Sequence, residues 1–361
     1  MLQNSQNIQR ANNFDFLRFL GAIFVVWGHS YALGAPPAPS FWGRGIHEFG
    51  VVVFFCISGY LVSQSLVRTS TVSSFLLKRC LRIFPALAAC VLISVFVLGP
   101  AVSTLDLQSY FLHPQTRRYL WNIVLSTQYF LPGVFDTNGK PGAVNGSLWS
   151  LPVEFVCYLA LAALCLMISR RRLIYGTAVL LLLTSATGLY LIQDPHSPLL
   201  YRTAFGLFPF FFAAGCLSLL GERVRYRLDV AIALIALLYL VSAANIVWLR
   251  EVALWLAVPY IVVAFGNRAS QSISDWGHRW HGDISYGIYL YSFPIQQLII
   301  HTPSTRPHVV TIIVGTLAGS IACGVASWHL IEKRALALKN RKSLPMRGAF
   351  TTLRRKALKP A

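Results

Sequence analysis

Long apolar blocks alternate with short polar connections along the whole chain. Each block covers about 20 residues, enough to cross the hydrocarbon core of a membrane as a helix. Inside lipid every backbone polar group must be bonded within the protein, and a helix does this within one segment. The blocks lie at residues 14–34, 49–66, 82–101, 148–168, 173–192, 200–220, 229–247, 252–266, 284–301 and 309–331. The pattern predicts an all-α fold, a polytopic membrane bundle of about ten transmembrane helices.

The composition agrees with this prediction. The chain is 55% hydrophobic and only 12% charged, about half the charge of an ordinary soluble domain. The first block follows a polar segment and has no small-residue cleavage site, so we expect it to remain as a helix. We therefore expect one membrane domain over residues 1–334. A basic tail, 335–361, should be disordered or lie on the membrane surface.

The basic residues indicate an orientation. With the N-terminus inside, 23 of the 31 Lys and Arg residues fall on the inner side and seven on the outer side, with Arg18 in the first block. This bias predicts that both termini of the multi-pass protein are cytoplasmic. The net charge of +19 is spread between the apolar blocks, which favours anionic membrane lipids rather than nucleic acid as partners. The cysteines have no metal-ligand spacing, and we expect no metal.

Two ionisable residues in the first block are candidates for function. Arg18 and His29 are eleven residues apart, which places them on one helix face about 16 Å apart. A cation at one end and a neutral base at the other suit a long ligand with an anionic head and a reactive far end. Alternatively, Arg18 snorkels to the surface or pairs with Asp15, and His29 makes a structural hydrogen bond between helices.

Glu154 is the next candidate. If the fourth span enters from outside near residue 147, Glu154 lies about 10 Å down, close to the depth expected for His29. A carboxylate there would orient the imidazole and stabilise its cationic form. The alternative is a structural carboxylate that accepts hydrogen bonds from Ser, Tyr or Trp side chains.

A basic cluster marks the start of the third span. Positive-inside topology alone accounts for Lys78. Arg79 and Arg82, three residues apart and running into the span, are better placed to bind phosphate.

Several motifs together resemble a known family. After the Arg18–His29 spacing come FFCISGYLVSQSL (54–66), FLLKRCLRIFPA (75–86), SLWSLPVEFVCYL (147–159), DISYGIYLYSFPI (283–295) and HLIEKR (329–334). In this order they resemble the bacterial integral-membrane acyltransferase family 3, over about residues 13 to 334. The resemblance implies about ten helices in a bacterial inner membrane and acyl transfer to extracytoplasmic sugars. Many members have a histidine where this chain has Ser292, so no catalytic role is assigned there.

The resemblance suggests specific roles. Arg18, Arg79 and Arg82 would hold the phosphates of cytoplasmic acetyl-CoA, the expected acyl donor. His29 would act as general base on a hydroxyl of a surface polysaccharide, lipopolysaccharide or lipo-oligosaccharide, supported by Glu154. Trp149, Tyr286 and Tyr289 would line the substrate cavity; the alternative for each is aromatic packing within the bundle. The long outer loop (101–147) would recognise the acceptor or only cap the bundle. The alternatives are a transporter or flippase, or acyl tailoring of a secreted small molecule.

Overall fold

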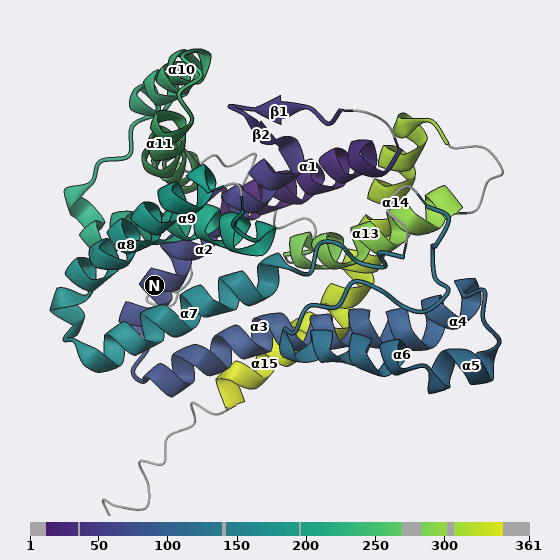
Figure 1. Cartoon of the computed structure of the whole chain (residues 1–361). Helices are drawn as coiled ribbons and strands as arrows, with labels where there is room; N and C mark the ends of the chain where they lie inside the picture. Colours follow the sequence, from purple (N-terminus) through teal and green to yellow (C-terminus); the bar gives the residue numbers. More distant parts are fainter. Residues whose placement is uncertain are drawn as a thin grey trace, which may run out of the picture.

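The structure is a computed structural model that describes residues 12–34, 37–138, 142–194, 196–268, 283–301 and 307–341. It is almost entirely helical, as predicted (Figure 1). The long helices are α1 (Phe14–Gly34), α2 (Ile46–Arg68), α3 (Val72–Ile93), α7 (Ser150–Met167), α8 (Leu173–Gln193), α9 (Leu199–Leu220), α10 (Leu228–Ala243), α11 (Val247–Asn267), α13 (Ser285–His301) and α14 (Val309–Ser327).

Each of the ten apolar blocks overlaps with one of these helices. Eight helical segments of the described chain are long and apolar enough to cross a membrane. The other two are α10, with 16 residues, and α13, with 17. Large apolar side chains lie on the outside of the bundle, for example Leu182, Leu240 and Met167. An outer surface of this kind suits contact with lipid rather than water.

The third helix is longer than its apolar block. The Thr71 side chain accepts a hydrogen bond from the Ser74 amide at 3.2 Å and so caps α3 ten residues before the expected start at residue 82. The helix continues through a π-helical turn (Ser94–Leu98) into α4 (Gly99–Val102). Arg79 and Arg82 therefore lie well inside a helix rather than at its mouth.

Helix α2 lies at the centre of the bundle and packs against α1 and α9. A Cβ atom on Gly50 would come within 2.5 Å of the Gly21 carbonyl oxygen, and one on Gly59 within 2.1 Å of the Phe211 carbonyl oxygen. Glycine at these positions lets the helix backbones approach closely, which is how membrane helices gain packing energy where lipid supplies no hydrophobic drive.

The segment before α7 descends into the bundle without forming a helix. The Asn145 side chain is fully buried and donates to the Leu290 carbonyl oxygen in the middle of α13 at 2.8 Å. The Ser147 carbonyl oxygen accepts from the Tyr289 hydroxyl at 2.6 Å. These bonds satisfy polar groups of an irregular segment deep in the bundle, as an apolar environment requires. Helix α7 consequently begins inside the bundle, not at its surface.

The described part of the loop between α4 and α7 contains short helices. It contains α5 (Leu107–Leu112), α6 (Pro114–Tyr119) and a 3-10 turn (Leu120–Val124), which packs along α3. Tyr110 and Tyr119 are fully buried. The described part of this loop thus covers one side of the bundle.

The basic tail begins as a helix. After α14, a π-helical turn (Trp328–Glu332) leads into α15 (Lys333–Arg341), which packs against α3. Residues 335–341, expected in a disordered or surface tail, are therefore helical, and 342–361 lie outside the described residues. Helices α1, α3, α8, α10 and α13 begin on one side of the bundle, here called the N-terminal side, while α2, α9, α11 and α14 begin on the opposite side.

Candidate functional site

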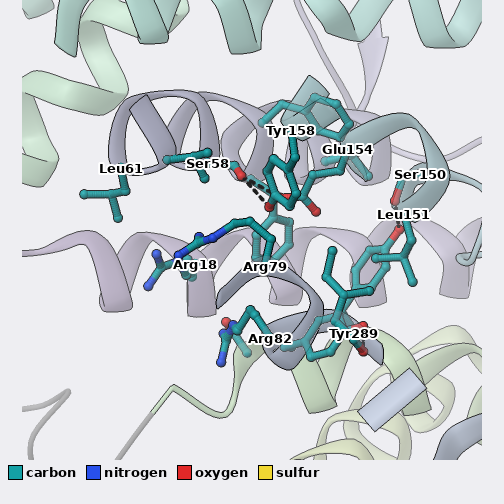
Figure 2. Close-up of a pocket in the computed structure, with 17 residues that line it drawn as sticks. Arg18, Ser58, Leu61, Arg79, Arg82, Ser150, Leu151, Glu154, Tyr158 and Tyr289 are labelled. Atoms are coloured by element: carbon teal, nitrogen blue, oxygen red, sulfur yellow. Dashed lines mark hydrogen bonds between the residues drawn. The ribbon is translucent and has the colours of Figure 1, made fainter. Parts of the chain in front are cut away.

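A cavity of about 110 Å³, here called the central cavity, lies among α1, α2, α3, α7 and α13 (Figure 2). Six of the eight candidate residues line it. They are Arg18, Arg79, Arg82, Glu154, Tyr286 and Tyr289. The α2 lining runs from Val51 to Val62, about 16 Å along the helix axis. The structure thus brings together residues that the sequence spreads over more than 250 positions.

Carboxylates surround two of the three arginines. Asp283 pairs with Arg18 at 3.2 Å and also with Arg82. Arg82 pairs in addition with Glu332 at 3.3 Å, and Arg18 with Asp15 at 2.7 Å. Asp283 and Glu332 are nearly buried. The charges of Arg18 and Arg82 are therefore largely balanced within the protein.

Asp283 holds the start of α13 as well as the two arginines. Its carboxylate accepts hydrogen bonds from the backbone amide and the hydroxyl of Ser285. Burial alone would raise the pKa of Asp283, but Arg82 and Arg18 together with the Ser285 bonds lower it below its ordinary value. The carboxylate is thus ionised at neutral pH and ties α1, α3 and α13 together.

Arg79 differs from its neighbours. It forms no ion pair with any residue that the structure describes, and its Nε is buried without a hydrogen-bond partner there. Its guanidinium lies 5.9 Å from the centre of the Tyr158 ring, a cation–π distance. Figure 2 shows the Arg79 side chain extended toward Arg18 at one end of the cavity. Arg79 is therefore the arginine with the most bonding capacity left for an anionic ligand.

Glu154 lies with hydroxyl groups at the level of the arginines. Its Oε1 accepts from Ser58 at 2.6 Å and from Tyr158. Ser58 is eleven residues after His47 on α2, about 16 Å along the axis, and the His47 ring packs on His29. The common depth expected for Glu154 and His29 is therefore not found, because α7 begins inside the bundle.

Two tyrosines of α13 shape the cavity wall. Tyr286 donates to the Ile83 carbonyl oxygen at 3.0 Å, and its ring faces the Arg82 guanidinium at 5.6 Å. The Tyr289 hydroxyl is bonded to Ser150 at 2.6 Å, at the end of the cavity away from Arg18 (Figure 2). Both hydroxyls are thus used to fix α13 against α3 and the start of α7.

His29 is not among the residues that line the central cavity. Its ring lies 5.1 Å from that of His47 and 5.2 Å from that of Phe293. His47 and Val51 are four residues apart and share a face of α2. Because Val51 lines the cavity, the histidine pair lies about one helical turn, 6 Å, beyond its end.

Trp149 faces a second cavity of about 410 Å³, here called the peripheral cavity. The peripheral cavity lies among the starts of α2, α9 and α11, on the side of the bundle opposite the N-terminal side. Val51 lines both cavities. Its charged lining residues are Arg44, Glu48, Arg202, Arg250 and Glu251. Of the loop expected to recognise an acceptor, 101–147, no described residue lines either cavity. In the part of the chain that the structure describes, no three His, Cys, Asp or Glu side chains lie close enough together to hold a metal ion.

Comparison with known sequences shows the family. Residues 12–325 match the family described as "Acyltransferase domain". The chain belongs to this acyltransferase family. It is therefore an enzyme that transfers acyl groups, as the motifs had indicated, and the membrane bundle is the body of that enzyme.

This acyltransferase is similar in sequence to several named proteins. It is 30% identical to "O-acetyl transferase" of Shigella phage Sf6, over 93% of this chain and 99% of the relative. It is 29% identical to "Nodulation protein 10" of Rhizobium leguminosarum bv. viciae, over 93% and 96%. It is 24% identical to "Peptidoglycan O-acetyltransferase OatA" of Listeria monocytogenes, over 89% of this chain and 55% of the relative. No solved structure matches.

Sequence reasoning missed several residues that shape the site of this acyltransferase. Asp283 and Glu332 stand in the motifs DISYGIYLYSFPI and HLIEKR, yet no role was predicted for either. Their signal was available, since each is one of only 12 acidic residues and borders an apolar block. Tyr158 lies four residues after Glu154, the spacing at which helical side chains meet. Ser292 is fully buried and bonds only within its own helical turn, to the Tyr289 carbonyl oxygen, among the described residues.

Proposed function

We propose that this acyltransferase moves an acetyl group from cytoplasmic acetyl-CoA to a hydroxyl of a surface polysaccharide, lipopolysaccharide or lipo-oligosaccharide, in the inner membrane of a bacterium. The family supports acyl transfer, and two relatives named for O-acetylation support acetyl as the group and oxygen as the acceptor atom. The observation that carries the proposal is the central cavity, with arginines at one end and a histidine pair beyond the other.

The donor would enter from the N-terminal side, which the Lys and Arg distribution predicts to face the cytoplasm. Arg79 is the arginine with donor capacity to spare, so it would bind a phosphate of acetyl-CoA directly. Arg18 and Arg82, held in place by Asp283, would offer their remaining N–H donors to the phosphates at the same end. The thioester arm would then lie along α2, where the wall between Ser58 and Val51 is mostly apolar.

His29 would act on the acceptor at the far end. In this step the imidazole takes the proton of the acceptor hydroxyl while the hydroxyl oxygen attacks the thioester carbonyl carbon. The new C–O bond forms, the C–S bond breaks, and the CoA thiolate leaves and is protonated. The aromatic neighbours His47 and Phe293 would hold the imidazole ring in position.

Glu154 would act at the donor end instead of supporting His29. Its hydrogen bonds from Ser58 and Tyr158 hold the Tyr158 ring under the Arg79 guanidinium. A fixed ring keeps the guanidinium in one position and lowers the entropy lost when a phosphate binds.

Transfer of label from acetyl-CoA tests the proposal. Purified protein in nanodiscs is incubated with acetyl-labelled acetyl-CoA and membrane glycans from a strain that lacks the gene. Label in the glycan fraction, released by mild base as an ester, is the expected result, and His29→Ala should abolish it. His196→Ala, a change at an exposed histidine of the α8–α9 loop, is the matched control. Consumption of acetyl-CoA without labelled glycan, or full activity of His29→Ala, would overturn it.

A further inference from the structure

The peripheral cavity has more positive than negative charge. Three arginines line it, at positions 44, 202 and 250, with two glutamates, at positions 48 and 251. Glu251 is nearly buried and pairs with Arg44, while its second oxygen lies 3.6 Å from Arg250. Arg202 forms no ion pair with any residue that the structure describes; at longer range it interacts with the half-buried Asp194, whose carboxylate is bonded to Ser197. The Arg202 guanidinium is therefore available to pair with an anionic ligand.

The arginines of this cavity also keep unused donors. The Nε atoms of Arg44, Arg202 and Arg250 are buried, and none of them donates a hydrogen bond within the described part of the chain. A buried donor without an acceptor costs free energy, so three of them in one wall favour a ligand that offers oxygen acceptors. Guanidinium groups bind carboxylates and phosphates best, because their donors match the spacing of the two oxygens.

A short hairpin places Arg44 at this cavity. Strands β1 (Ser40–Phe41) and β2 (Arg44–Gly45) pair in antiparallel fashion, and the two turn residues have positive φ, 49° at Trp42 and 76° at Gly43. Two positive φ angles are the mark of the tight turns that join paired strands. A Cβ on Gly43 would come within 2.4 Å of the Arg250 guanidinium. The turn is thus packed on Arg250 and fixes Arg44 beside it.

The two cavities meet at a common wall. Val51 lines both, and Trp149 in the peripheral cavity is followed by Ser150 in the central one. His47 lies one turn before Val51 on the same face of α2 and carries the ring that packs on His29. A molecule in the peripheral cavity would therefore reach the end of the central cavity close to the histidine pair.

We infer that the peripheral cavity binds the acceptor, and that the acceptor is an anionic saccharide carrying a carboxylate or a phosphate. The inference rests on the proposed function for the role of the bound sugar as acceptor. Arg202 binds the anionic group, with Arg44 and Arg250 fixed beside it by Glu251. Glu48 and Trp149 face the sugar, one as an acceptor of hydroxyl hydrogen bonds and the other as an apolar plane.

Binding to three matched disaccharides tests this inference. Full-length protein in nanodiscs is titrated with cellobiose, with cellobiouronic acid, which has a carboxylate at C6, and with cellobiose 6′-phosphate. We expect the wild type to bind at least one anionic probe about tenfold more tightly than cellobiose. The preference should weaken as salt is raised. Whichever of the two anionic probes binds more tightly identifies the source of the charge, an acidic sugar or a phosphorylated one.

Two variants test whether Arg202 causes the preference for anionic probes. Arg202→Gln should bring the anionic probes to the affinity of cellobiose, whereas Arg118→Gln, at an exposed arginine of α6, should leave the preference intact. Equal or absent binding of charged and neutral probes by the wild type would overturn the inference, as would equal behaviour of the two variants. Because binding is measured without acetyl-CoA, this result is separate from the transfer assay. A protein that prefers the anionic probes but never labels glycan would retain an anion site while the proposed function fails.

Discussion

The rings of His29 and His47 lie 5.1 Å apart and are tilted by 40°. One comes from the last turns of α1 and the other from the first turn of α2. The neighbouring Gly28 makes this approach possible, since a Cβ atom there would lie 2.6 Å from the His47 amide nitrogen. The position of the proposed base is therefore set by close packing of two helix ends.

Replacing either histidine should separate a reacting group from a positioning one. His29→Ala should lower transfer by roughly 100-fold or more, the usual contribution of general-base catalysis. His47→Ala should lower kcat less, roughly tenfold, because the base remains but loses a packing neighbour. Initial rates of label transfer at saturating acetyl-CoA measure both. A larger loss for His47→Ala than for His29→Ala would reverse the two roles.

Gly28→Ala should impair catalysis through the same contact. The added methyl group has to displace the backbone at His47, so we expect transfer to fall roughly tenfold while the protein stays folded. Gly319→Ala is a suitable control, because the new methyl would meet only a side chain, that of Ile295, at 3.2 Å. The size-exclusion profile and thermal unfolding of the purified variant show whether it is folded. They therefore distinguish a displaced His47 from an unfolded protein. Wild-type rates in Gly28→Ala would contradict the prediction.

The sequence predicted the helices and the arginine end well, because apolar length and positive charge depend on local composition. It misplaced Glu154 because a span was assumed to start at the surface. In the structure the backbone around Asn145 runs irregularly into the bundle. There the Asn145 side chain donates to the Leu290 carbonyl oxygen and the Ser147 carbonyl oxygen accepts from Tyr289, contacts between segments that are far apart in sequence. The peripheral cavity was out of reach for a similar reason. Arg44 stands in the hairpin before α2, Arg202 in the first turn of α9 and Arg250 in the first turn of α11, and they meet only once the helices pack.

Glu154→Gln tests the depth of this carboxylate. If Glu154 lies at the donor end, about 16 Å from the level of His29, the variant should keep the pH midpoint of kcat unchanged. The KM for acetyl-CoA should change, since the group that fixes Tyr158 under Arg79 is altered. Steady-state rates across the pH range measure both quantities. A midpoint displaced to lower pH would instead show that the carboxylate supports the cationic imidazole of His29.

Arg79 and Arg82 should respond differently to the same substitution. Arg79→Gln removes a guanidinium without an ion pair among the described residues, so we expect the KM for acetyl-CoA to rise about tenfold with little loss of stability. Arg82→Gln leaves Asp283 and Glu332 short of a partner and should destabilise the protein by about 3 kcal/mol. The double variant Arg82→Gln, Glu332→Gln should recover part of that loss. Thermal unfolding and acetyl-CoA titration distinguish the two effects, and equal stability of the two single variants would contradict this division.

The stabilising effect of Asp283 should be independent of pH over the physiological range. Its pKa is lowered in the folded protein, so its contribution is fully present above the ordinary value of about 3.9 and is lost only as pH falls through the folded value. The difference in Tm between wild type and Asp283→Asn should therefore stay constant from about pH 5 to 8 and shrink only below about pH 4. Glu222→Gln, a change at an exposed carboxylate after α9, controls for general acid effects. A Tm difference that instead changes in favour of the wild type as pH falls from 7 to 5 would show that burial outweighs the two arginines and that Asp283 takes up a proton near neutrality.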